Sequence, residues 1–226
     1  MSVAALGTQP TYLRSALPGA PLQIALDPIQ RLEKMSPSEL QQLGANDKTG
    51  FFKALQAAAI ESERKYGVPA EVTLAQAALE SGWGKSPIGG YNIFGIKGEG
   101  PAGSVIKETR EWDGSKYITV KAKFAKYHNF YEAVVEHGKL FHNGYYDKAV
   151  NQFAKDKDYK NFISNIQGIY ATDPKYSTKL NQIIDQYHLA TRRTPSQDLL
   201  GPIWDFCKNA FTRLKSWLVA IWKRLE

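Results

Sequence analysis

The sequence predicts an α+β fold that is mainly α, in which a helical lobe is joined to a small β-hairpin lobe. Two observations predict it. In residues 47–85 and 128–190, apolar side chains recur three and four positions apart, which is the period of an amphipathic helix. Between these segments, residues 105–127 alternate with a period of two around Asp113-Gly114, a pattern typical of a hairpin with a two-residue turn. With 226 residues, 43% of them hydrophobic, the chain can bury a sizeable core.

The beginning of the chain predicts an arm followed by a short helix. Residues 1–35 contain four prolines among short apolar patches, so we expect an irregular arm. Ser36 then predicts the N-cap of a helix that has a proline in its first turn, and Gly44 predicts its end. Residues 1–13 carry no basic residue, so no secretory signal peptide is expected. No uncharged apolar run approaches the ~20 residues that a membrane helix needs.

The segment that organises the domain follows a helix predicted to end at Gly67. Pro69 suits the first turn of the next helix, and Gly82 suits its end. Glu80 then lies in the last turn, where the negative end of the helix dipole disfavours an ionised carboxylate. Desolvation by Trp83 would raise the pKa of Glu80 further, which prepares a carboxylic acid to donate a proton near neutral pH. The alternative is an ordinary solvated glutamate beside a helix end.

The middle of the chain predicts loops and then the hairpin. Six glycines between residues 86 and 104 interrupt the helical period, without the spacing of a phosphate-binding motif. The first strand of the hairpin carries Glu108 and Glu111. Because they are three positions apart, they face opposite sides, and only one can look into a site shared with Glu80. The alternative for such a glutamate is a cross-strand ion pair with a lysine.

The residues that bind metals in proteins are sparse here. No histidine belongs to a metal-binding motif, and the only cysteine, Cys207, excludes an intramolecular disulfide. Neither a metal nor another cofactor is therefore expected. The histidines are His128, His137, His142 and His188.

The end of the chain predicts a linker and a basic amphipathic helix. The net charge of the chain is +7, and residues 191–226 contribute seven basic and three acidic side chains to it. Over residues 202–225, tryptophan and leucine recur at helical spacing opposite lysines. This pattern is typical of a helix on an anionic membrane or lipopolysaccharide surface. It is equally typical of a helix docked on its own domain or in a partner's groove.

Four motifs occur in order along the chain: AQAALESGWGKS at 75–86, YNIFGIKG at 91–98, TREWDG at 109–114 and YATDPKYSTKL at 170–180. Together they resemble the bacterial cell-wall glucosaminidases of glycoside hydrolase family 73, which include the hydrolase domain of flagellar rod assembly proteins. The resemblance implies a lysozyme-like helical lobe. It predicts a glucosaminidase domain over residues 47–190, preceded by the arm and short helix of residues 1–46 and followed by residues 191–226.

The resemblance also assigns roles to residues. Glu80 is expected to be the general acid. Glu111, which ends the pattern Thr109-Arg110-Glu111, is expected to be the second catalytic carboxylate, with Glu108 as its alternative. The residues expected to bind the glycan are Gln76, Trp83, Tyr91, Asn92, Phe94 and Tyr170.

The function that follows is hydrolysis of β-1,4 bonds in peptidoglycan, on the N-acetylglucosamine side. The alternatives are a muramidase or lytic transglycosylase, and a non-catalytic cell-wall-binding component of a phage tail or secretion apparatus. The expected partner is the glycan strand of peptidoglycan, with possible contact to an anionic membrane, and no nucleic acid. The protein is expected to be made in the cytoplasm and delivered to the cell wall by a holin, a virion or a secretion machine.

Overall fold

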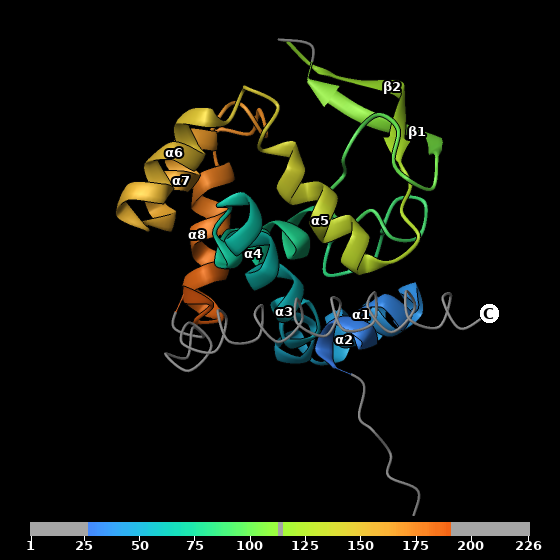
Figure 1. Cartoon of the computed structure of the whole chain (residues 1–226). Coiled ribbons are helices and arrows are strands. Elements are labelled where there is room, and N and C mark those ends of the chain that lie inside the picture. Colours follow the sequence, from blue (N-terminus) through green and yellow to red (C-terminus); the bar gives the residue numbers. More distant parts are fainter. Residues whose placement is uncertain (1–26, 113–114, 191–226) are drawn as a thin grey trace, which may run out of the picture.

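A computed structural model describes residues 27–112 and 115–190 (Figure 1). The arm before residue 27, the Asp113-Gly114 turn and the predicted C-terminal helix lie outside the described residues. The two strands are β1 (Ser104–Trp112) and β2 (Tyr117–Ala125). Within the described part of the chain, no helix is both long and apolar enough to cross a membrane. The helices described are α1 (Pro28–Lys34), α2 (Pro37–Asn46), α3 (Lys48–Tyr66), α4 (Ala70–Glu80), α5 (Phe130–Leu140), α6 (Asp147–Asp156), α7 (Tyr159–Ile166) and α8 (Tyr176–Gln186).

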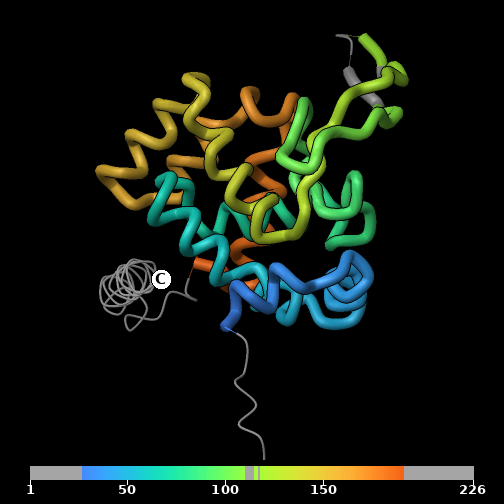
Figure 2. Tube along the Cα trace, turned by 45° about the vertical axis from the view of Figure 1, so that its right-hand side comes forward, coloured from blue at the N-terminus to red at the C-terminus, as the bar shows by residue number. Residues whose placement is uncertain are grey.

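Helix α4 lies at the centre of the helical lobe (Figure 1). It packs against α3, α7 and α8, while α1 and α2 pack on α3. Helix α5 packs on α3 and α1, and α6 packs on α7. The hairpin extends from one end of this lobe, on the side away from α6 and α7 (Figure 2). The predicted fold class, a mainly α domain with a small hairpin lobe, is therefore confirmed.

The central position of α4 follows from its composition. Every residue from Ala70 to Ala78 is buried, including the polar Thr73 and Gln76, so the helix has no solvated face until its last turn. Its N-cap, Pro69, makes no side-chain capping bond. Glu63 of α3 supplies one instead, because its carboxylate accepts a hydrogen bond from the backbone N–H of Ala70 at 2.7 Å.

The turn after α4 ends the helix as the sequence predicts. Ser81 is the C-cap, and Gly82 follows it in a left-handed conformation with φ of 58°. The backbone of α2 approaches this turn closely. A Cβ atom on Gly44 would lie 1.8 Å from the carbonyl oxygen of Trp83. The prediction that Gly44 ends its helix is therefore wrong: α2 continues to Asn46, and the glycine permits close packing.

Residues 28–34, predicted to belong to an irregular arm, form helix α1 instead. The carboxylate of Asp27 caps this helix by accepting from the backbone N–H groups of Ile29 and Gln30, and Pro28 occupies its first turn. The proline is thus a helix start and not a breaker. Leu32 of α1 is buried in the same core as the later helices.

The hairpin has a longer connection than the sequence predicts. The last pair of the antiparallel ladder is Trp112 with Tyr117, so residues 113–116 join the strands. The prediction of a two-residue turn formed by Asp113 and Gly114 is therefore wrong. The observed register places Glu108 opposite Lys121 and Glu111 opposite Ile118.

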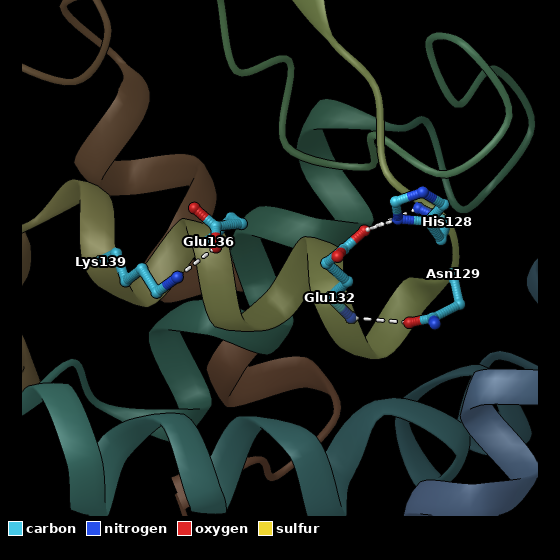
Figure 3. A network of polar contacts seen from close by, with 5 residues as sticks. All are labelled: His128, Asn129, Glu132, Glu136 and Lys139. Carbon is cyan, nitrogen blue, oxygen red and sulfur yellow. Dashed lines mark hydrogen bonds and ion pairs between the residues drawn. The ribbon is translucent and has the colours of Figure 1, made fainter. Parts of the chain in front are cut away.

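Helix α5 separates a polar surface from a buried face. On the polar side, Asn129 caps the helix, and Glu132 accepts from the backbone N–H of His128 at 2.7 Å and lies 2.9 Å from its Nδ1 (Figure 3). Glu136 and Lys139 form an ion pair farther along the same helix (Figure 3). The buried side of α5 includes Ala133, Val134, His137 and Gly138. The helix thus carries a histidine into the core, next to α4.

Candidate active site

Glu80 is the last residue of α4, and its side chain is exposed to solvent. On its protein side it faces α8, from which Tyr176 donates a hydrogen bond and Lys179 contributes a positive charge. Desolvation raises the pKa of Glu80 above its ordinary value, and the two α8 groups oppose this rise. A carboxyl group that is open to water on one side and crowded on the other can both hold a proton and reach a substrate.

Tyr170 packs against Tyr176, the tyrosine that faces Glu80. Burial, the neighbouring Tyr176 and the charge of Glu80 raise the pKa of the phenol of Tyr170. The ring of Tyr170 is stacked between those of Phe141 and Tyr176, with centroids 5.8 Å from each. Its hydroxyl donates to the backbone carbonyl of Phe94 at 3.3 Å. The structure therefore brings together two of the predicted site residues, Glu80 and Tyr170.

The loop motif at residues 91–98 is anchored in the core. Both amide hydrogens of Asn92 are used, since its Nδ2 donates to the carbonyls of Ile96 and Ala125 at 2.9 Å. Its Oδ1 accepts from the N–H groups of Phe94 and Ile96. Because Asn92 is also buried, its contacts tie the loop to β2 and do not support the predicted contact with sugar.

The aromatic residues of this loop face other parts of the core. The buried ring of Phe94 is stacked on His137 with a centroid distance of 4.0 Å, and the half-buried ring of Tyr91 packs edge-on against Phe130. These contacts account for both rings as packing residues and do not support the glycan-binding role predicted for them.

Trp83 packs among other aromatic rings. Its indole contacts Phe51, Phe52 and Tyr187, and the ammonium group of Lys48 lies 4.1 Å from the ring centroid. Like Gly82, Trp83 has a left-handed backbone, with φ of 66°. The cluster holds this strained turn in place and so fixes the direction in which the chain leaves the helix that carries the glutamate.

The two candidate second carboxylates lie on the hairpin. Glu108 is exposed and stands opposite Lys121, whereas Glu111 stands opposite Ile118. The structure does not describe the side chain of Glu111, and only its register position in the hairpin is given.

Sequence reasoning missed the residues that surround Glu80. Tyr176 and Lys179 belong to the fourth motif, but they were given no role there. Their spacing of three on α8 was the signal available, since it places both on one helix face. His137 was weighed only as a metal ligand. Within residues 27–112 and 115–190, no group of three or more His, Cys, Asp or Glu side chains could hold a metal ion.

Comparison with known proteins agrees with this geometry. The family model described as mannosyl-glycoprotein endo-β-N-acetylglucosaminidase matches residues 56–189, more than half of the chain. The chain belongs to this glucosaminidase family. Residues 56–189 are therefore a glycoside hydrolase domain, of the kind classed as glycoside hydrolase family 73.

Individual members of the glucosaminidase family show how far the similarity extends. The exo-glucosaminidase LytG of Bacillus subtilis is 38% identical over 55% of this chain and 46% of its own length. A protein named probable N-acetylmuramidase of Lactococcus lactis is 34% identical over 70% of this chain and 37% of its own length. The chain thus spans less than half the length of these two relatives.

A solved family structure shows the same fold. The catalytic domain of the autolysin Auto from Listeria monocytogenes superposes with a TM-score of 0.57 and 37% sequence identity. The match covers 64% of this chain and 86% of that domain. The helical lobe and hairpin described above are therefore the family's own architecture.

Proposed function

We propose that this chain hydrolyses β-1,4 glycosidic bonds of peptidoglycan as an N-acetylglucosaminidase. The observation that carries the proposal is Glu80, a solvent-open carboxyl group at a helix end whose pKa is raised by desolvation. Such a group stays protonated closer to neutral pH than an ordinary glutamate, as a general acid must. Membership of the glucosaminidase family supports the substrate class.

In this mechanism Glu80 protonates the oxygen of the leaving sugar. The proton transfer leaves a carboxylate, which the hydroxyl of Tyr176 and the charge of Lys179 stabilise. Desolvation raises the pKa of Glu80 and so favours the protonated acid, whereas these two groups lower it and so favour release of the proton.

A second carboxylate completes the reaction. It either activates a water molecule or stabilises the positive charge that develops on the anomeric carbon. We assign this part to Glu111. The family resemblance supports the choice, because Glu111 ends the pattern Thr109-Arg110-Glu111, whereas Glu108 is exposed and stands opposite Lys121 in the ladder.

Two other functions give different products from the same substrate. The name of one relative, probable N-acetylmuramidase, favours a muramidase. The match to that relative covers 70% of this chain. A non-catalytic wall-binding protein gives no products. Digestion of purified sacculi, borohydride reduction and mass spectrometry separate these cases. Reduced N-acetylglucosamine ends support the proposal, reduced muramic acid ends indicate a muramidase, and anhydro-muramic ends indicate a lytic transglycosylase.

We further propose that residues 202–225 bring the enzyme to an anionic surface such as a membrane or lipopolysaccharide. The segment lies outside the described residues, so the support is its sequence: tryptophan and leucine at helical spacing opposite lysines, in a chain of net charge +7. Delivery to the wall by a holin, a virion or a secretion machine belongs to the same proposal.

A further inference from the structure

A line of buried hydrogen bonds connects three helices and ends on Glu80. His137 of α5 has its Nε2 2.9 Å from Oε1 of Gln76 on α4. The Nε2 of Gln76 donates to the hydroxyl of Tyr176 on α8 at 2.8 Å. Tyr176 in turn is hydrogen-bonded to the carboxyl group of Glu80. His137 and Gln76 are fully buried, and Tyr176 is 2% exposed.

When Glu80 is ionised, the chemistry of these groups fixes the direction of every bond in the line. Once Glu80 has given up its proton, its carboxylate can only accept, so in that state the hydroxyl of Tyr176 must donate to Glu80. Its oxygen is then the acceptor for Gln76, which must turn its NH₂ toward Tyr176 and its carbonyl toward His137. The Nε2 of His137 must therefore carry a proton. All donors point toward Glu80.

His137 is a fixed donor and not a group that changes charge. Burial lowers its pKa to about 3, so the ring is neutral near neutral pH. Stacking on Phe94 holds its plane. Its Nδ1 is buried and has no hydrogen-bond partner among the described residues, which agrees with a proton on Nε2 alone.

This arrangement replaces the substrate-binding role that the sequence suggested for Gln76. A buried amide whose NH₂ and carbonyl already serve Tyr176 and His137 is not placed to contact a sugar. Its position between the histidine and the tyrosine gives it a different use. By donating to the oxygen of Tyr176, Gln76 can orient the hydroxyl hydrogen of Tyr176.

We propose that Gln76 and His137 are positioning residues for Glu80, and that they act by holding the hydroxyl of Tyr176 as a donor to its carboxylate. The inference rests on the proposed role of Glu80 as general acid. The hydroxyl keeps the carboxyl group oriented and stabilises the carboxylate that remains once the proton has been given to the leaving sugar.

The proposal predicts a shift in pH dependence. The groups that face Glu80 are Tyr176 and Lys179 of α8, together with Tyr170 from the loop before it. The hydrogen bond from Tyr176 lowers the pKa of Glu80, so its removal raises that pKa. Since the acid works in its protonated form, the alkaline limb of the pH–rate profile moves to higher pH. A purely structural role would change stability or maximal rate without moving that limb.

The test uses the full chain on purified sacculi, with kcat/KM measured against pH. Tyr176→Phe is expected to move the alkaline limb upward by about 1 unit, the lower end of what a hydrogen bond to an ionised carboxylate contributes, and to lower kcat more than it changes KM. Gln76→Met is expected to move it in the same direction by less. The double variant is expected to match Tyr176→Phe, because Gln76 acts only through that hydroxyl.

Two further variants test whether the shift is specific to this line of hydrogen bonds. Tyr131→Phe is the matched control, since it removes the same atom from a tyrosine that donates to Glu61 at 3.0 Å, on α5 and away from Glu80. It should leave the limb unmoved. His137→Phe keeps a ring on Phe94 but removes the donor, and it should shift the limb as Gln76→Met does. The folding of each variant is checked by its thermal melting temperature.

Titration of Glu80 by carboxyl carbon NMR on the free protein separates the two possible failures. If Glu80→Gln keeps its activity while the NMR pKa of Glu80 still rises in Tyr176→Phe and Gln76→Met, the assignment of the general acid is wrong and the hydrogen-bond line stands. If Glu80→Gln is inactive but Gln76→Met leaves the pKa of Glu80 unchanged, the positioning role is overturned. Additive shifts in the double variant overturn it as well.

Discussion

Gly44→Ala tests how tightly the turn beside Glu80 is built. The added Cβ would lie 1.8 Å from the carbonyl oxygen of Trp83, and real Cβ atoms essentially never come within 3.0 Å of another atom. The neighbour is backbone and cannot rotate away, so α2 must move off the turn that follows α4. That movement disturbs the packing of Gly84 against Leu40, which is already close.

The size of the effect follows from two opposing contributions. Overpacking of this kind costs roughly 1–3 kcal/mol, and a rigid neighbour puts the cost at the upper end. Exchanging glycine for alanine inside a helix returns about 1 kcal/mol. We therefore expect a net loss of about 2 kcal/mol, which corresponds to a fall in melting temperature of roughly 4–8 °C for a chain of this size.

Calorimetry or thermal circular dichroism of the full chain measures this fall, with Gly50→Ala as the matched control. At Gly50 the added Cβ would meet the carboxylate oxygen of Asp47 at 2.3 Å, but that side chain can rotate away. The loss of the bond from the N–H of Gly50 to Asp47 costs about 1 kcal/mol, which the helix propensity of alanine offsets. An unchanged or higher melting temperature for Gly44→Ala would refute the reasoning.

Three other predictions concern the site and the tail. Lys179→Met removes a positive charge that lowers the pKa of the general acid, so the alkaline limb of activity should move to higher pH. Lys175→Met is the control, because Lys175 and Lys179 both lie beside Asp173. It should leave the alkaline limb in place, and equal shifts in the two variants would count against the assignment. Glu111→Gln should reduce hydrolysis of sacculi strongly and Glu108→Gln only mildly, and the reverse order would exchange their roles. Deleting residues 199–226 should preserve hydrolysis of sacculi and abolish binding to anionic lipid vesicles. A truncated protein that aggregates or is inactive on sacculi would show that the segment belongs to the folded core.

The sequence predicted the parts of the fold that depend on local chemistry. The helix that carries Glu80 could be found from a proline before it, an apolar period within it and Gly82 after it, all of which act over one or two turns. The change of period from helix to hairpin was equally local. The family motifs added the expectation that Glu80 and Tyr170 belong to one site.

What could not be predicted depends on contacts between distant segments. Gly44 looked like a helix end, because the approach of Trp83, in the turn after α4, is invisible in local sequence. Asn92 is a polar loop residue like many that bind sugars. Only the fold shows that its amide group donates both its hydrogens to the carbonyl oxygens of Ile96 and Ala125. Gln76 and Tyr176 are 100 residues apart, so no spacing rule connects them.

The most direct test of the central claim is the rate at which Glu80→Gln releases fragments from purified sacculi. The products are reduced with borohydride and measured by mass spectrometry beside those of the unchanged chain. A glutamine of nearly the same shape cannot donate the proton, so we predict that the unchanged chain yields reduced N-acetylglucosamine ends and that the variant, folded to the same melting temperature within a few degrees, yields almost none. Release of the same ends by Glu80→Gln at a similar rate would contradict the account.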